Sequence, residues 1–212
     1  MKNNSNFLKS INSDQRKIFL NLNSIEKIQS FLDSIVYSSD PIYRCPLRVF
    51  KEKVGHCFDG AVFAAFALSQ IGFPPIIIDM LPNQRDDDHI LALYKINDHW
   101  GAIAKSNFVG LRFREPIFKT LRELVLSYFE QYYNTAKEKT LRGYTVPLNL
   151  KIFDKQNWQT EDNTMELIAQ KLDKIRKFNL LTHDMEKRLL QVDVRTYSAG
   201  LIGVNEAGLF KP

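Results

Sequence analysis

The 212-residue sequence has only two cysteines, and no stretch of it is apolar over the roughly 18 residues that a membrane-spanning helix needs. Cys45 and Cys57 could pair in principle, but the default cytoplasmic location is reducing, so two free thiols are expected. The first residues, from Met1 to Asn6, lack the apolar run of about 7 to 15 residues of a secretory signal. The sequence therefore predicts a cytoplasmic protein that does not bind membranes.

Charge of one sign is not concentrated anywhere in the chain. Lys and Arg number 29 against 24 Asp and Glu, which leaves a net charge of +5 without any run of basic residues. This pattern predicts no specific nucleic-acid partner. Hydrophobic residues make up 44% of the sequence, enough for a chain that folds on its own, and no shift in composition divides it. We therefore expect a single domain over residues 1–212.

Hydrophobic spacing predicts helices mixed with an antiparallel sheet. Apolar residues recur at helical spacing after Ser24. The alanine-rich stretch Cys57 to Ile71, almost without charge, predicts a helix buried on most sides. Gly72 is suited to end that helix. Strands are expected at 75–81, 89–96, 100–107 and 109–114, and an edge strand or ordered coil at 144–153. Further helices are expected at 117–132, 165–175 and 185–190. The predicted fold is α+β, with a core over about 24–153, flanking N- and C-terminal helices, and a C-terminal helical extension over about 154–212.

Cys57 stands at the expected start of the buried helix. The unpaired backbone N–H groups and the positive dipole end of that helix would point at its sulfur, which favours a reactive thiolate. The same N–H groups could form part of an oxyanion hole, and Gly55 permits a tight entry into the helix. The opposing interpretation is that Cys57 is a small buried hydrophobic residue, as free cysteines often are.

His89 is the predicted partner of Cys57. It begins the second expected strand, directly after Asp86, Asp87 and Asp88. A cysteine at a helix start, followed by a histidine on a strand and a polar residue on the next strand, is the chain order of papain-like and transglutaminase-like thiol enzymes. A histidine flanked by carboxylates can also be a solvated strand end.

Three stretches of the sequence carry a closer resemblance. Gly55–Ala61, Asp86–His89 and Trp100–Asn107 resemble a group of uncharacterised bacterial proteins of the transglutaminase-like superfamily. The resemblance continues through Arg112–Pro116 and into 139–142, and so covers most of the chain. It implies a cysteine-proteinase-like core, in which a helix with the nucleophile packs on an antiparallel sheet with the histidine. It implies no particular substrate, because that superfamily includes proteases, acyltransferases, amide hydrolases and inactive members.

The third catalytic residue departs from the superfamily pattern. Members usually have an aspartate four positions after the strand tryptophan, and here that position is Ala104. A two-residue turn at Asn97 would place Ser106 opposite His89, whereas a three-residue loop would place Asn107 there. An asparagine oxygen can accept a hydrogen bond from the imidazole and is a stronger anchor than a serine hydroxyl, so Asn107 is predicted to orient His89.

Two further residues bear on the predicted site. Asp79, near the end of the preceding strand, is a third candidate to orient the histidine, beside Asn107 and Ser106. His56 adjoins Cys57 but leaves the chain in a different direction, so it is not the expected base.

The resulting hypothesis is a thiol-dependent acyl-transfer enzyme. Cys57 would attack an amide or ester carbonyl of a peptide or small molecule, His89 would act as base and then acid, and Asn107 would orient His89. Water or an amine would be the final acceptor, and no cofactor is required. No metal is expected, because the cysteines and histidines lack the spacing of a zinc site. The alternative is an inactive transglutaminase-like fold that serves as a binding or scaffold protein.

Overall fold

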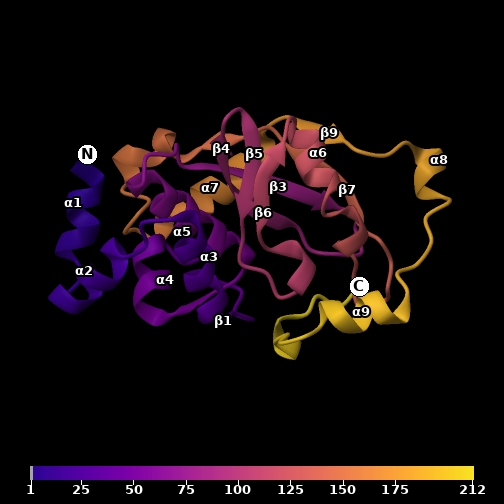
Figure 1. The fold of residues 1–212 in the computed structure, drawn as a ribbon, viewed down its shortest axis with the longest axis horizontal. Coiled ribbons are helices and arrows are strands. Elements are labelled where there is room, and N and C mark those ends of the chain that lie inside the picture. The colour runs from indigo at the N-terminus through magenta and orange to yellow at the C-terminus, as the bar shows by residue number, and fades with distance from the viewer. Residues whose placement is uncertain (1) are drawn as a thin grey trace.

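The computed structural model describes residues 2–212, which form an α+β fold around a seven-stranded antiparallel sheet (Figure 1). The strands lie in the order β6-β5-β4-β3-β7-β9, and β8 pairs with β3. Their bounds are β3 Ile76–Pro82, β4 His89–Ile96, β5 His99–Ile103, β6 Arg114–Phe118, β7 Leu141–Thr145, β8 Leu148–Asn149 and β9 Lys177–Asn179. A separate parallel pair joins β1 (Val36–Tyr37) to β2 (Val54–Gly55).

Helices lie on both faces of the sheet and at both ends of the chain. The α-helices are α1 Lys2–Lys9, α2 Ser13–Leu20, α3 Ile25–Ser34, α4 Pro46–Glu52, α5 Cys57–Gln70, α6 Leu121–Leu126, α7 Asn163–Lys174, α8 His183–Glu186 and α9 Val194–Gly200. Short 3₁₀ turns are η1 Val109–Leu111, η2 Phe129–Gln131, η3 Leu150–Gln156 and η4 Glu206–Gly208.

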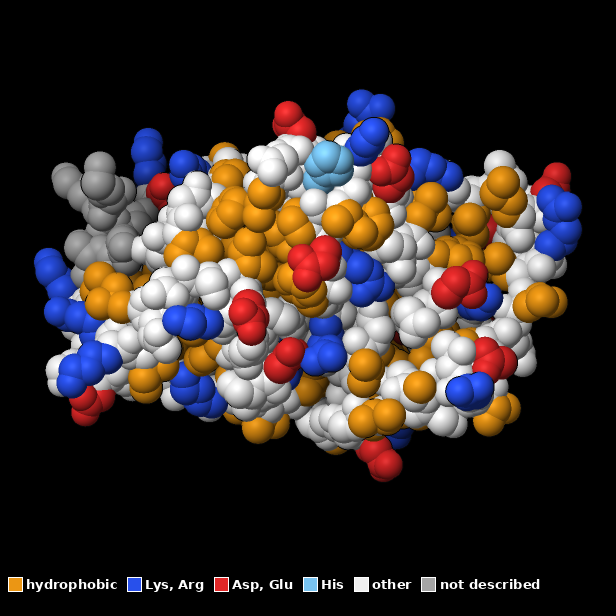
Figure 2. Space-filling model, in the orientation of Figure 1, with side chains coloured by type: hydrophobic (Ala, Val, Ile, Leu, Met, Phe, Trp, Pro, Cys, Tyr) orange, Lys and Arg blue, Asp and Glu red, His pale blue; other side chains and the backbone are white. Residues whose placement is uncertain are grey.

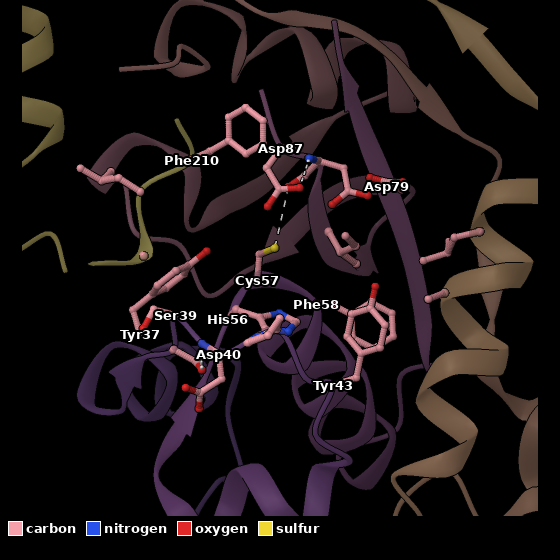
Figure 3. A pocket seen from close by; sticks show the side chains of 18 of the residues that line it. Tyr37, Ser39, Asp40, Tyr43, His56, Cys57, Phe58, Asp79, Asp87 and Phe210 are labelled. Atoms are coloured by element: carbon pink, nitrogen blue, oxygen red, sulfur yellow. Dashed lines mark hydrogen bonds between the residues drawn. The ribbon is translucent and has the colours of Figure 1, made fainter. Parts of the chain in front are cut away.

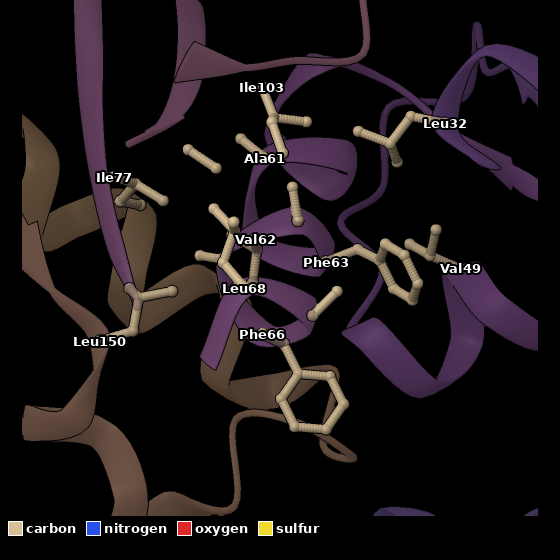
Figure 4. Packing of buried hydrophobic residues seen from close by; sticks show 14 of the residues in the cluster. Leu32, Val49, Ala61, Val62, Phe63, Phe66, Leu68, Ile77, Ile103 and Leu150 are labelled. Carbon is tan, nitrogen blue, oxygen red and sulfur yellow. The ribbon is translucent and has the colours of Figure 1, made fainter. Parts of the chain in front are cut away.

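The predicted buried helix is confirmed as α5. Every residue from Cys57 to Leu68 is buried, and the helix packs on β3 and β4 with α3 and α4 on its other side (Figure 4). Alanines at 61, 64, 65 and 67 let neighbouring backbones approach closely on several sides at once. Gly72 follows the helix with a φ of 97°, the left-handed conformation expected after a helix end.

Side chains alternate between two hydrophobic clusters along the central strands, as the period of a β-strand requires. Ile77, Ile90 and Ala92 belong to the cluster around α5, which we call the α5 face of the sheet. Ile78 and Leu91 belong to the second cluster, with Leu124, Val125, Tyr128 and Tyr132 from α6 and the turn after it. We call this the α6 face. Side chains on the α5 face cannot contact side chains on the α6 face across the sheet.

The β4–β5 hairpin is confirmed, and it has the shorter of the two connections considered. Asn97 and Asp98 both have positive φ, 46° and 62°, as in a two-residue type I′ turn. Ile96 pairs with His99, and β5 ends at Ile103. The expected strand over 100–107 is therefore too long by four residues.

The segment after this hairpin differs from the prediction. The expected strand at 109–114 is instead η1, and the strand β6 begins at Arg114. The expected helix from Ile117 begins at Leu121, because the Thr120 side chain accepts a hydrogen bond from the N–H of Glu123 and caps the helix there. The apolar residues at 117 and 118 therefore belong to a strand.

The fold has the expected flanking helices at its N-terminus, α1 and α2, although the spacing of residues before Ser24 does not locate them. The Phe7 ring of α1 and the Phe19 ring of α2 lie 4.8 and 5.4 Å from the Phe66 ring of α5. Trp158 and Met165, which follow residue 153, belong to the same cluster. Packing around α5 therefore extends beyond residues 24–153 on both sides.

The outer surface has no concentration of basic side chains on the face drawn in Figure 2. Lys and Arg are scattered over this face and interleaved with Asp and Glu. Among residues 2–212, no helix combines the length and apolar character needed to cross a membrane.

Candidate functional site

Cys57 is the first residue of α5, and a polar network fixes it there. His56 caps the helix in an extended conformation, and the Asp59 carboxylate accepts hydrogen bonds from the N–H groups of His56 (3.3 Å) and Arg44 (2.8 Å). Asp59 is fully buried, and its Oδ2 lies 3.6 Å from the Arg44 guanidinium. The network therefore positions Cys57 at one wall of a pocket (Figure 3).

The thiol of Cys57 is held by the backbone. Its Sγ lies 3.8 Å from the carbonyl oxygen of Asp88, to which the thiol donates. Burial and the charges of Asp88 and Asp87 raise the pKa of Cys57 well above its usual range, although N–H groups of Ile90 and Phe58 oppose them. The sulfur in this arrangement is a protonated thiol rather than a thiolate.

His89 lies on the opposite face of the sheet from Cys57. Its Nε2 donates to the carbonyl oxygen of Leu111 at 2.8 Å, and its ring lies 6.4 Å from the Tyr132 ring, on the α6 face. The next residue, Ile90, faces α5 instead. Burial lowers the pKa of His89 to about 4. Side chains alternate along β4, so Ile90 points toward α5 and Cys57 while His89 points to the opposite face. The structure thus does not bring the predicted Cys57–His89 pair together.

Asn107 and His89 line the same small cavity, but the hydrogen bonds of the Asn107 side chain go to another residue. Its Nδ2 donates to the carbonyl oxygen of Asn205 at 2.9 Å, and its Oδ1 accepts from the N–H of Asn205 at 2.8 Å. Asn107 therefore anchors the C-terminal segment. The two-residue turn puts Ser106 in line with His89, but Ser106 lies beyond the end of β5 and its Oγ accepts from the N–H of Phe108.

A pocket of about 480 Å³ opens beside Cys57. Five aspartates line it, and within the described part of the chain no Lys or Arg does: the aspartates are Asp40, Asp79, Asp87, Asp88 and Asp173. Its apolar walls include four aromatic side chains, Tyr37, Tyr43, Phe58 and Phe210. Phe210 comes from the C-terminal tail, whose sequence shows no periodicity. Sequence patterns offer no signal for its position here.

Asp79 is the unusual member of this pocket. Its side chain lies on the α5 face of β3, and the residue is only 2% exposed. Its Oδ1 has no hydrogen-bond partner among the described residues. Burial, and next the charge of Asp88, raise the pKa of Asp79 well above its usual range. Asp79 thus lines the pocket with a carboxyl group whose Oδ1 is buried and unsatisfied, and it does not lie on the face of the sheet where His89 could be oriented.

Replacing Asp79 by asparagine is expected to stabilise the empty protein at pH 8. A carboxyl with a raised folded-state pKa binds more protons when folded than when unfolded, so wild-type stability falls as pH rises from about 4 through that pKa. An asparagine side chain does not titrate, so the variant's advantage should be largest at pH 8 and should vanish near pH 4. Thermal unfolding between pH 4 and 9 measures this difference. A melting temperature at pH 8 equal to or below wild type would contradict it.

Within residues 2–212, no three His, Cys, Asp or Glu side chains converge as a metal-binding group would require. Both cysteines are free thiols, and Cys45 does not line the pocket beside Cys57. Burial raises the pKa of the Cys45 thiol to about 12.

Comparison with known proteins finds no matching family model and no matching curated protein. Among solved structures, Legionella pneumophila LapG is similar over 46% of this chain and 67% of its own, with 19% identity and a TM-score of 0.36. Its calcium-bound form gives 19% identity and a TM-score of 0.36 over 48% of this chain and 69% of that one. Its EGTA-treated form has 18% identity and a TM-score of 0.35, over 46% of this chain and 65% of that one. A similarity at this level carries no conclusion about function.

Proposed function

We propose that this protein is a binding protein whose pocket beside Cys57 holds a small ligand without covalent chemistry. The observation that supports this proposal most directly is the separation of Cys57 from His89 on opposite faces of the sheet. Thiol catalysis requires a thiolate and a base within reach of it. The Cys57 thiol instead donates to the backbone carbonyl of Asp88, and His89 donates to that of Leu111.

The pocket has the size and composition of a ligand site. Its volume of about 480 Å³ falls in the range of roughly 300 to 1,000 Å³ that is common for small-molecule pockets. Aromatic walls such as Tyr43 and Phe58 can enclose an apolar part of a ligand, and the carboxylates can fix its orientation. The function of the protein would then be to bind a specific small ligand in this pocket.

A second candidate function is thiol-dependent acyl transfer on an amide or ester, as in a hydrolase, a peptidase or a transglutaminase-like enzyme. The observation that favours it is the position of Cys57 at the first residue of α5, on the wall of a pocket and near the N–H groups of Ile90 and Phe58. Those groups could stabilise negative charge on sulfur. This function requires His89 to leave Leu111 and reach the other face of the sheet.

Alkylation of the two cysteines separates the two functions. Because burial raises the pKa of both thiols, we expect Cys57 and Cys45 to react slowly with iodoacetamide below pH 8. His89→Ala should leave the rate at Cys57 unchanged. Mass spectrometry of labelled peptides between pH 5 and 9 gives both rates, and labelling in urea gives the rate of each unfolded thiol.

The acyl-transfer function makes the opposite forecast for the same measurement. It requires Cys57 to react at pH 6 at least tenfold faster than Cys45, and His89→Ala to remove that difference. Such a result would overturn the proposal of a non-covalent binding protein.

A further inference from the structure

We propose that the ligand of this pocket is an organic cation, a primary ammonium or guanidinium group on an apolar stem, bound by Asp79 and Asp88. This inference rests on the proposed binding function and names the chemical class that the pocket selects. Three features of the pocket favour such a ligand: its charge, the unsatisfied carboxyl of Asp79 and its aromatic walls.

The charge of the pocket is opposite to that of the chain. The protein has a net charge of +5, yet five aspartates line this pocket and none of the described Lys or Arg residues does. One of the five, Asp40, is paired with Arg44 behind the pocket wall. His56 also lines the pocket, and burial lowers its pKa, so its ring is neutral near pH 7. The pocket therefore concentrates carboxyl groups. Burial raises the pKa values of Asp79, Asp87 and Asp88, and neighbouring carboxylates raise those of Asp79 and Asp88 further, so a cationic ligand would favour their ionised forms.

Asp79 has a buried carboxyl oxygen that lacks a hydrogen-bond donor among the described residues. A buried carboxyl oxygen without a donor is unfavourable by about 1 to 3 kcal/mol or more, and proteins seldom keep such an atom without a use for it. The free Oδ1 of Asp79 belongs to a residue that lines the pocket. In Figure 3, Asp79 and Asp87 lie together on one side, across the pocket from Tyr43 and Phe58. An ammonium or guanidinium group there would donate the hydrogen bond that Asp79 lacks.

The aromatic walls distinguish an organic cation from a metal ion. The Tyr43 ring lies 4.5 Å from the Phe58 ring and 5.6 Å from the His56 ring, so three rings form one wall. Tyr37 and Phe210 line the pocket elsewhere. Aromatic faces attract ammonium and guanidinium groups and pack against their alkyl stems. The missing three-ligand cluster in the described residues leaves a metal ion less suited to this site.

Protonation of the carboxyls should compete with the cation. Asp88, Asp87, Asp173 and Lys177 act on Asp79 from three neighbouring elements, and the buried Tyr132 phenol lies on the α6 face nearby. The three aspartates disfavour its charged form, whereas Lys177 favours it. Binding of a cation would ionise Asp79 and release a proton. Affinity should therefore rise by about tenfold or more from pH 5.5 to 8.5.

Isothermal titration calorimetry on the full chain tests the inference, with EDTA present to exclude metal ions. The probes are agmatine, cadaverine and Nα-acetyl-argininamide, and 1,5-pentanediol is the neutral counterpart of cadaverine. We expect at least one cationic probe to bind and pentanediol to bind at least tenfold more weakly. A free diamine or guanidine that binds better than the blocked arginine indicates a small-molecule ligand, and the reverse order indicates a basic side chain of a peptide.

Two variants locate the binding site. Asp79→Asn should weaken the cation at least tenfold, although we expect this variant to be at least as stable as wild type, so unfolding would not explain the loss. Asp98→Asn removes a carboxylate at the exposed β4–β5 turn and should have no effect on affinity.

Failure of this inference is distinguishable from failure of the proposed function. No binding by any cationic probe, or equal affinity in Asp79→Asn and wild type, would overturn the organic-cation assignment. Binding of pentanediol as tightly as cadaverine would also overturn it, yet would leave a non-covalent pocket. The alkylation rates of Cys57 test the binding function separately, because they do not depend on which ligand the pocket selects.

Discussion

The Arg44→Met variant is expected to lose about 3 to 5 kcal/mol of unfolding free energy, as proteins do when one partner of a buried ion pair is removed. Arg44 is 3% exposed and is surrounded by Asp40, Glu52 and Asp59. Methionine fills a similar volume but leaves the fully buried Asp59 without its guanidinium partner. Chemical denaturation with urea measures the loss.

The same variant should also change how stability depends on pH. Burial raises the pKa of Asp59 to about 7 in the wild type, so its stability falls with rising pH only up to about that value. Removing the Arg44 charge raises this pKa further, and the variant should continue to lose stability above pH 7. The difference from wild type should therefore be larger at pH 8.5 than at pH 6.

A matched control uses the other arginine of this region. Arg48 pairs with Glu52 and Asp162, but its side chain is 36% exposed. Arg48→Met should lose no more than about 1 kcal/mol, because exposed ion pairs contribute little. Equal losses in Arg48→Met and Arg44→Met would show that the buried network does not fix the start of α5.

The second large effect is expected for Gly60→Ala in α5. A Cβ added at Gly60 would lie 2.2 Å from the Cβ of Lys105, closer than two carbon atoms can approach. Lys105 cannot easily retreat, since its Nζ donates to the carbonyl oxygens of Leu32 (2.9 Å) and Ile35 (2.6 Å) at the end of α3. We expect a loss of about 3 kcal/mol, the upper part of the range for overpacked cores. Urea denaturation measures it.

A double-mutant cycle identifies the cause. In a Lys105→Gly background the clashing Cβ is absent, so Gly60→Ala should stabilise the protein by up to about 1 kcal/mol through helix propensity. The change of sign is the decisive observation. If Gly60→Ala is neutral in the wild-type background, or equally unfavourable in both, then contact with Lys105 is not what requires glycine at this position.

Local sequence was enough to specify the elements that bear the site. Apolar composition and alanine content predicted α5 to within one residue of its end, because a helix buried on most sides carries few charged residues; its one carboxylate, Asp59, lies in the first turn beside Arg44. β-branched and alternating residues predicted β3 and β4 to within a residue or so of their observed ends. Asn97 and Asp98 tolerate the positive φ of a tight turn, so the β4–β5 hairpin could also be predicted from the sequence.

Which side chains meet depended instead on tertiary packing. Cys57 and Asp79 face one pocket while His89 faces the other side, and this depends on the register of Met80 with His89 between β3 and β4. A shift of one residue would exchange the two faces, and local sequence does not encode that register because the loop of residues 83–88 has no periodicity. The pairing of Asn107 with Asn205 likewise joins residues 98 positions apart. Side-chain chemistry could therefore be read from the sequence, but which groups share a cavity was set by packing and strand register.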